Sequence, residues 1–260
     1  MKLDFDTEAN ILDLISDLDQ SNWKIISDTK GSDNYLKTSE ILETFLKENL
    51  FKRWKDNSLS QLPPDFVNER DGLMMEIMRF DDHSPDGKKN PNLAKQRKMA
   101  EELQPFMAMF PNAKHVFINA VTDLPTEEDH NYRFYCNAFK RTVAKHSTKI
   151  ASYRKNHPGK KLIFLAVDES SGIYFERTPN AGRLPLGRPH FPFCDKRLID
   201  CFDAIDIDYF ILFCPFNHCE SIGGHIELPK LVIFDIKNMD SGDLIQRIEY
   251  DEKRMFSSEQ

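Results

Sequence analysis

The chain has 260 residues, of which 40% are hydrophobic and 30% charged, and its formal net charge is −7. This length and apolar content are enough for a sizeable core, and we expect one α/β domain over residues 1–260, with residues 1–60 forming a helical segment packed on the sheet. No apolar run reaches the roughly 18 residues that a membrane span needs, and the first residues are acidic. We therefore expect a cytoplasmic protein with no membrane partner.

The five cysteines show no paired Cys-x-x-Cys spacing, which is typical of a protein in a reducing compartment. Cys214, His218 and Cys219 are residue types that bind zinc, but tight structural zinc sites usually have a second ligand pair at similar spacing. We therefore do not expect zinc.

The N-terminal part should be helical. Apolar residues at helical spacing predict a first helix within residues 1–20, followed by a polar break at 28–38. A second helix should follow Ser39, which we interpret as its N-cap. Its acidic residues, Glu40 and Glu43 among them, are most simply solvated.

Residues 64–83 form an apolar, strand-like run with a carboxylate in its middle. The turn signal Asp71-Gly72 predicts a hairpin. If Arg70-Asp71 or Asp71-Gly72 is the centre of the turn, Asp65 and Glu76 lie on one face, about 5–8 Å apart. Two carboxylates at that separation can share a divalent cation such as Mg²⁺ or Mn²⁺. A three-residue loop would instead turn one of them away, because side chains alternate along a strand.

Pro64-Asp65, ten intervening residues and then Glu76-Ile77-Met78 resemble the signature of the PD-(D/E)XK nucleases, over roughly residues 40–122. The resemblance implies a restriction-endonuclease-like core and a metal-dependent phosphodiesterase. It also implies that Asp65 and Glu76 bind the metal that polarises the phosphate and activates water.

Met78 stands where that family has a lysine, which helps to orient the water and to stabilise developing charge. The resemblance therefore implies a poor nuclease, with little or no cleavage of plasmid or single-stranded DNA. Lys95 or Arg97 would be the substitutes for the lysine, from a helix expected after the hairpin. Glu40 or Glu43 would be the candidates for an extra carboxylate from the preceding helix.

Structural roles account for the same residues. Asp65 follows a proline turn and Asp71 is a common turn residue. Glu76 lies between apolar neighbours, and a buried carboxylate needs a partner. A salt bridge would satisfy Glu76 as well as a metal would.

The middle of the chain predicts a helix over residues 93–110, interrupted near Pro105, and a buried strand over 115–122. Thr126-Glu-Glu-Asp129 resembles a capping box with aspartate in place of glutamate. A long helix should continue from it to about His157.

That long helix carries an unusual charge pattern. Residues 131–161 hold nine lysines and arginines and no acidic residue. Arg141, Lys145 and Lys149 recur every four residues on one helix face. The pattern fits a footprint for a nucleic-acid backbone or another phosphate ligand. It also fits an ordinary solvated face that meets acidic neighbours.

Three apolar runs predict further strands, at residues 161–167, 209–213 and 231–234. The loop over residues 177–193 contributes Arg183 and Arg188 as candidate phosphate ligands, because long aperiodic loops are often functional. A short helix is expected around residues 196–204. The alternation of strands and helices predicts an α/β fold with the sheet sandwiched between helices.

Polar residues follow several of these strands and form a candidate strand-end cluster, namely His83, Asp168, Glu169 and His218. A second acid pattern, Asp235-Ile236-Lys237 with Asp208 upstream, has the Asp-x-Lys spacing but lacks a clear helix and strand after it. Three interpretations remain open. The chain is a nuclease-like phosphodiesterase, a non-catalytic binder of nucleic acid, a nucleotide or a protein, or a different α/β enzyme acting at the strand ends.

Overall fold

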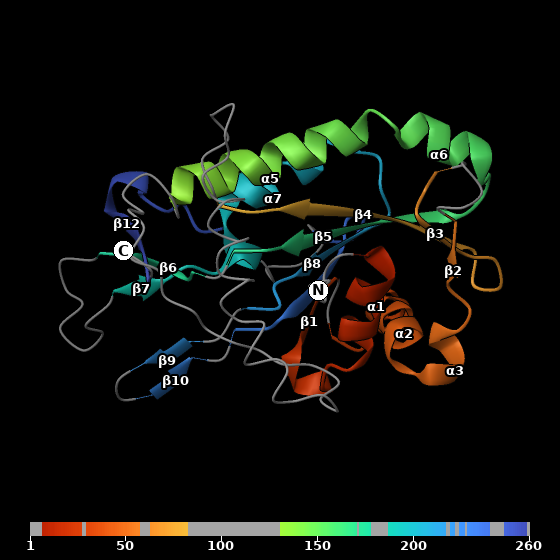
Figure 1. Ribbon diagram of the computed structural model, residues 1–260, viewed down its shortest axis with the longest axis horizontal. Coiled ribbons are helices and arrows are strands. Elements are labelled where there is room, and N and C mark those ends of the chain that lie inside the picture. The colour runs from red at the N-terminus through yellow and green to blue at the C-terminus, as the bar shows by residue number, and fades with distance from the viewer. Residues whose placement is uncertain are drawn as a thin grey trace, which may run out of the picture.

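The computed structural model describes residues 7–27, 30–57, 63–82, 131–170, 172–177, 187–216, 219–221, 224–226, 228–239 and 247–258. Its main feature is a seven-stranded mixed sheet of order β1-β11-β8-β5-β4-β3-β2 (Figure 1). In chain order these strands are β1 (Trp23–Ile26), β2 (Lys55–Asp56), β3 (Phe66–Asn68), β4 (Leu73–Phe80), β5 (Lys161–Asp168), β8 (Tyr209–Phe213) and β11 (Leu231–Asp235).

The three central strands β4, β5 and β8 are parallel, whereas β3 and β11 run antiparallel to their neighbours β4 and β8. β1 is parallel to β11 and forms one edge of the sheet. The expected α/β class is therefore confirmed, and the sheet is mixed.

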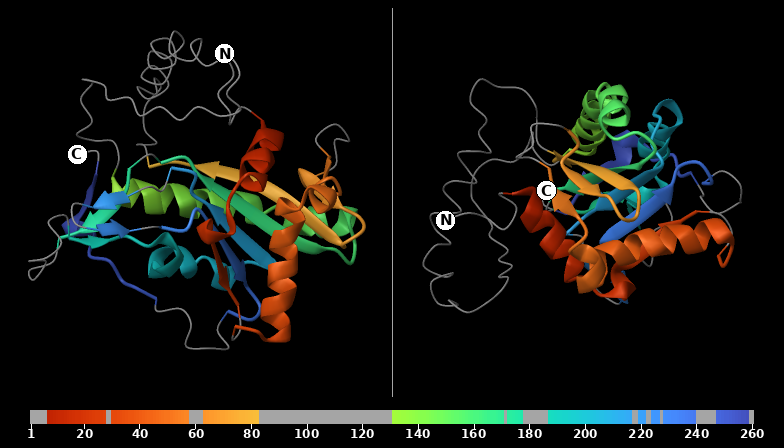
Figure 2. Two further views of the ribbon diagram at one scale, coloured as in Figure 1. Left: turned by 90° about the horizontal axis from the view of Figure 1, so that it is seen from below. Right: turned by 90° about the vertical axis from the view of Figure 1, so that its right-hand side faces the viewer.

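Helices cover both faces of this sheet (Figure 2). One layer contains α1 (Glu8–Ser16), α2 (Asp33–Leu46) and α3 (Glu48–Phe51), and the other contains α5 (Tyr132–Ser147), α6 (Ile150–Asn156) and α7 (Lys196–Ile199). Side chains alternate between the two faces along the central strands, so their apolar residues form two core clusters, one beneath each helical layer. This explains why those strands are apolar along almost their whole length.

Smaller elements complete the fold. A three-stranded sheet contains β12 (Met255–Ser257), β6 (Tyr174–Glu176) and β7 (Arg188–Pro189), and a two-stranded sheet contains β9 (Cys219–Ser221) and β10 (Gly224–Ile226). The 3₁₀ turns are η1 (Gln20–Asn22), η3 (Pro192–Cys194), η4 (Phe202–Ala204) and η5 (Glu252–Arg254). No helix of the described residues is long and apolar enough to cross a membrane.

Two helix boundaries differ from those predicted. α2 begins at Asp33 and not after Ser39, because the Ser32 side chain accepts a hydrogen bond from the backbone of Tyr35 and caps the helix about two turns earlier. The predicted long basic helix is also divided: α5 ends at Ser147, and α6 begins at Ile150. The expected elements at 93–110, 115–122 and 126–129 lie outside the described residues.

Candidate functional site

The β3–β4 hairpin brings Asp65 and Glu76 together. Phe66 pairs with Met75, and Asn68 pairs with Leu73. This is the register centred on Arg70-Asp71, one of the two considered, and its continuation by one residue places Asp65 opposite Glu76. The turn is fixed by the Asn68 amide, which donates a hydrogen bond to the Asp71 carboxylate at 2.9 Å.

Glu76 is 3% exposed and points towards α5 and α6, as do Met74 and Met78 on the same face of β4. Its Oε1 contacts Nδ1 of His146 at 2.8 Å and Nζ of Lys149 at 3.5 Å. Burial opposes ionisation of Glu76, but the hydrogen bond from His146, the nearby Tyr153 hydroxyl and the nearby positive charges outweigh it, so the pKa of Glu76 lies below its usual value. Glu76 is therefore an ionised, buried carboxylate.

The second oxygen of that carboxylate is less well satisfied. Neither Oε2 of Glu76 nor the buried hydroxyl of Tyr153 has a hydrogen-bond partner of good geometry among the described residues. The Tyr153 hydroxyl is nevertheless near enough to Glu76 to favour the charged carboxylate. An unsatisfied buried oxygen marks Glu76 as a group that the local packing does not fully explain.

Asp65 behaves differently from Glu76. Its Oδ2 accepts a hydrogen bond from the backbone nitrogen of Ile77 at 2.7 Å. Burial, followed by the charge of Glu76, raises the pKa of Asp65 to about 7. Burial, and then the charge of Glu76, also raises the pKa of Glu8 in the first turn of α1. Sequence reasoning missed Glu8, because a glutamate in a first helical turn is unremarkable.

The lysine that contacts Glu76 comes from an unexpected place. Lys149 lies between α5 and α6, about seventy residues after the hairpin, and Met78 is buried in the core at 2% exposure. The two predicted substitutes, Lys95 and Arg97, lie outside the described residues. Among the residues described, no group of three or more histidines, cysteines, aspartates or glutamates is arranged to hold a metal ion.

The predicted basic ridge divides into two parts. Arg141 and Lys145 are exposed on α5 and form no ion pair within the described part of the chain, whereas Lys149 contacts Glu76. Arg188 is not a free phosphate ligand, because it bonds to Glu176 at 2.5 Å and stacks on the Tyr250 ring. Arg183 lies outside the described residues.

Asp168 and Glu169 of the predicted strand-end cluster point to opposite faces of the sheet. Asp168 is buried beneath α5, where its Oδ2 accepts a hydrogen bond from the Tyr135 hydroxyl at 2.9 Å. Glu169 forms an ion pair with Arg79 on the other face. Consecutive strand residues alternate in direction, so these two carboxylates do not form one site. His83 and His218 lie outside the described residues.

The other acidic candidates have structural partners. Asp235 accepts hydrogen bonds from Ser27 and Asn238, and Lys237 forms an ion pair with Asp208 at 2.8 Å. Asp235 at the end of β11 and Lys237 just after it therefore form structural contacts at the end of the sheet.

Glu40 and Glu43 lie on α2, in the layer opposite Glu76. Both line a groove of about 360 Å³ between α2 and the hairpin turn, with Arg53 and Lys161. Glu43 also forms an ion pair with Lys47. They are therefore separated from the Asp65–Glu76 pair by the sheet.

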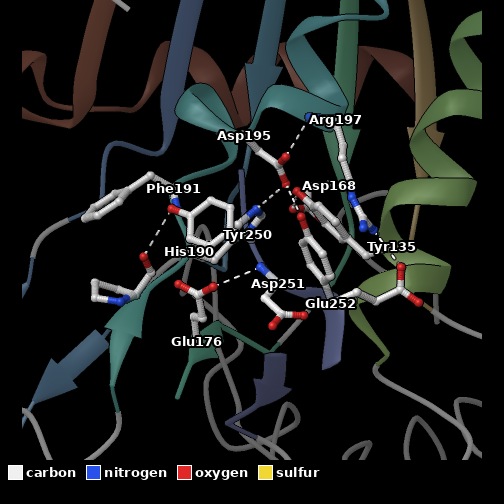
Figure 3. A network of polar contacts seen from close by, with 12 residues as sticks. Tyr135, Asp168, Glu176, His190, Phe191, Asp195, Arg197, Tyr250, Asp251 and Glu252 are labelled. Carbon is white, nitrogen blue, oxygen red and sulfur yellow. Dashed lines mark hydrogen bonds and ion pairs between the residues drawn. The ribbon is translucent and has the colours of Figure 1, made fainter. Parts of the chain in front are cut away.

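A buried polar network near the carboxyl ends of the central strands was not predicted (Figure 3). Asp195 is fully buried, and its Oδ2 accepts hydrogen bonds from Tyr132 at 2.7 Å and His190 at 2.8 Å. Its Oδ1 caps α7 by accepting from the Arg197 backbone at 2.8 Å. His190, Asp195 and Arg197 are near one another in sequence, but Tyr132 precedes Asp195 by 63 residues, so no local pattern indicates the whole network.

No protein-family model, curated protein or solved structure matches this chain. The site must therefore be interpreted from its own geometry. Two features stand out. One is a buried carboxylate bonded to two basic side chains, and the other is an exposed row of cations on the helix above it that form no ion pair with any described residue.

Asp168 should make stability depend on pH. Burial raises the pKa of Asp168 from its usual 3.8 to about 7, with a smaller contribution from the charge of Asp82. Between about pH 4 and 7 the folded chain keeps this proton while the unfolded chain releases it, so Asp168 lowers stability as pH rises through that window and has no further effect above it.

We expect Asp168→Asn to remove this dependence. The difference in the unfolding constant between variant and wild type should change by up to about tenfold per pH unit within the window. Urea denaturation at four pH values between 4.5 and 7.5 measures it. A wild-type-to-variant difference that stays constant with pH would contradict the assignment.

Proposed function

We propose that this protein binds the phosphate backbone of nucleic acid through the exposed basic face of α5. We define this basic face as Lys140, Arg141 and Lys145. α5 lies on the outside of the sheet (Figure 1). All three side chains are exposed on it, although the chain as a whole is acidic. Clustered lysine and arginine on one helix face is the electrostatic footprint of nucleic-acid binding.

The absence of described acidic partners on this face carries the proposal. An ordinary solvated helix face in an acidic protein would meet carboxylates, and many other described cations do so, such as Lys47 with Glu43, and Arg53 with Asp71. Within the described residues, no member of the basic face forms an ion pair. Such side chains keep their charge available for phosphate, and counterions released from the nucleic acid favour the contact.

Salt dependence tests this proposal. Fluorescence anisotropy with a 20-nucleotide single strand and the corresponding duplex should give an affinity that falls steeply between 50 and 200 mM salt. Arg141→Ala/Lys145→Ala should lower the slope of log K against log salt by nearly one unit for each lost contact, or up to about two units on duplex DNA.

The matched control is Lys47→Ala/Lys52→Ala, which also removes two lysines, in this case from the opposite helical layer. Both of these lysines form ion pairs along their own helices. The control should retain the wild-type slope. If the wild type shows no binding at low salt, or both double variants lose the same slope, nucleic acid is not the partner of this face.

A further inference from the structure

We infer that Asp65 and Glu76 form a latent divalent-cation site that the chain's own basic residues, His146 and Lys149, fill in place of the metal. This inference goes beyond the proposed binding function and does not depend on it. Removal of these two side chains should therefore create a metal site that the native protein lacks.

The geometry of Glu76 carries the argument. His146 and Lys149 approach the same oxygen, Oε1, at 2.8 and 3.5 Å. The ionised Glu76 carboxylate can only accept hydrogen bonds, so Nδ1 of His146 must be the donor. Lys149 adds a full positive charge beside a carboxylate that is 3% exposed. A divalent ion at this oxygen would have to displace the histidine and approach the ammonium group against electrostatic repulsion.

The remaining atoms of the site fit a hard cation. Oε2 of Glu76 and the fully buried Tyr153 hydroxyl lie close to the carboxylate pair, and neither has a hydrogen-bond partner of good geometry among the described residues. Asp65 uses only Oδ2 to hold the hairpin backbone. Two carboxylates are enough for Mg²⁺ or Mn²⁺, which often complete their coordination with water.

The charges around Asp65 and Glu76 explain why basic side chains lie where a metal ion would otherwise bind. The continued hairpin register places Asp65 opposite Glu76. Two carboxylates side by side repel each other and are stabilised by nearby positive charge. In a metal enzyme a cation would supply that charge. Here Lys149 supplies a positive charge from the link between α5 and α6, and His146 donates a hydrogen bond from α5.

The test compares Mn²⁺ binding by the wild type and by His146→Gln/Lys149→Met, followed by the electron paramagnetic resonance signal of free Mn²⁺. Glutamine removes the His146 imidazole and methionine removes the Lys149 charge, and both replacements keep most of the side-chain volume. We expect no Glu76-dependent binding in the wild type at millimolar Mn²⁺, and binding at least about tenfold tighter in the double variant. Adding Glu76→Gln to the double variant should abolish the gain.

Two results would overturn the inference. One is wild-type Mn²⁺ binding that disappears in Glu76→Gln, because the native carboxylates would then hold metal directly. The other is a folded double variant with no gain in binding. If the double variant is unfolded without Mn²⁺, circular dichroism should show Mn²⁺-dependent refolding, because a ligand stabilises the state that binds it.

If the double variant stays unfolded, Mn²⁺ binding by the single variant Lys149→Met tests the inference instead. Lys149 is 45% exposed, so its replacement should leave the fold intact. It should bind Mn²⁺ more tightly than wild type, and Lys155→Met, an exposed lysine on α6, is the matched control. No gain in Lys149→Met, or an equal gain in the control, would also overturn the inference.

Discussion

Asp195→Ala should lower the free energy of unfolding by about 3–5 kcal/mol, one of the two largest stability effects that we predict. The Asp195 side chain is fully buried and accepts hydrogen bonds from Tyr132, His190 and the Arg197 backbone. Alanine would leave the phenol and the imidazole buried without their partner, and each such loss is costly in a low-dielectric interior. It would also remove the N-cap of α7, which alone typically contributes about 1 kcal/mol.

Asp200→Ala is the matched control, because it removes the same side chain from the other end of α7. Asp200 is 37% exposed and pairs with Lys196 and Arg247 at the surface. Exposed ion pairs typically contribute about 1 kcal/mol or less. Urea denaturation of the two variants at one pH measures the contrast. A loss below about 1 kcal/mol for Asp195→Ala would show that the network relaxes around the missing carboxylate.

Features that depend on local sequence were predicted well. The apolar runs of β5, β8 and β11 give strands because each run is short, buried on both faces and bounded by polar residues. The hairpin followed from the turn signal Asp71-Gly72, which is a property of a few adjacent residues. That signal left two registers open, and the structure has the one centred on Arg70-Asp71.

Features that depend on long-range packing were not predicted. The partners of Glu76 are His146 and Lys149, which approach from the helical layer about seventy residues later in the chain. Nothing in the sequence around Glu76 indicates which helix covers it. The same limit applies to Lys149, whose spacing placed it on a phosphate-binding ridge, while the end of α5 turns it towards Glu76.

β1 and β2 were also missed, because their sequence signals are weak. β1 contains only Trp23–Ile26 and β2 only Lys55–Asp56, and neither shows a clear alternation of apolar and polar residues. They are strands because neighbouring strands offer them hydrogen-bond partners, β11 for β1 and β3 for β2. Tertiary context thus decided their conformation.

Met78→Lys, which introduces the residue type expected from the nuclease resemblance, should destabilise the protein by about 4–5 kcal/mol at pH 7. Met78 is 2% exposed and packs in the core beneath α5. A lysine there would lose its proton to avoid burying a charge, and deprotonating a group with a usual pKa of about 10.4 at pH 7 costs about that much. Met78→Leu, which keeps the volume and has no charge, should cost less than about 1.5 kcal/mol.

The sign of the pH dependence distinguishes this explanation from simple overpacking. If the buried lysine is neutral when folded, the unfolded chain binds one more proton below about pH 10, so the stability of Met78→Lys rises with pH relative to that of Met78→Leu. Urea denaturation at pH 7, 8 and 9 should therefore show the gap between the two variants closing. A gap that stays constant would mean that the ammonium remains charged beside Glu76, and that position 78 accommodates a lysine.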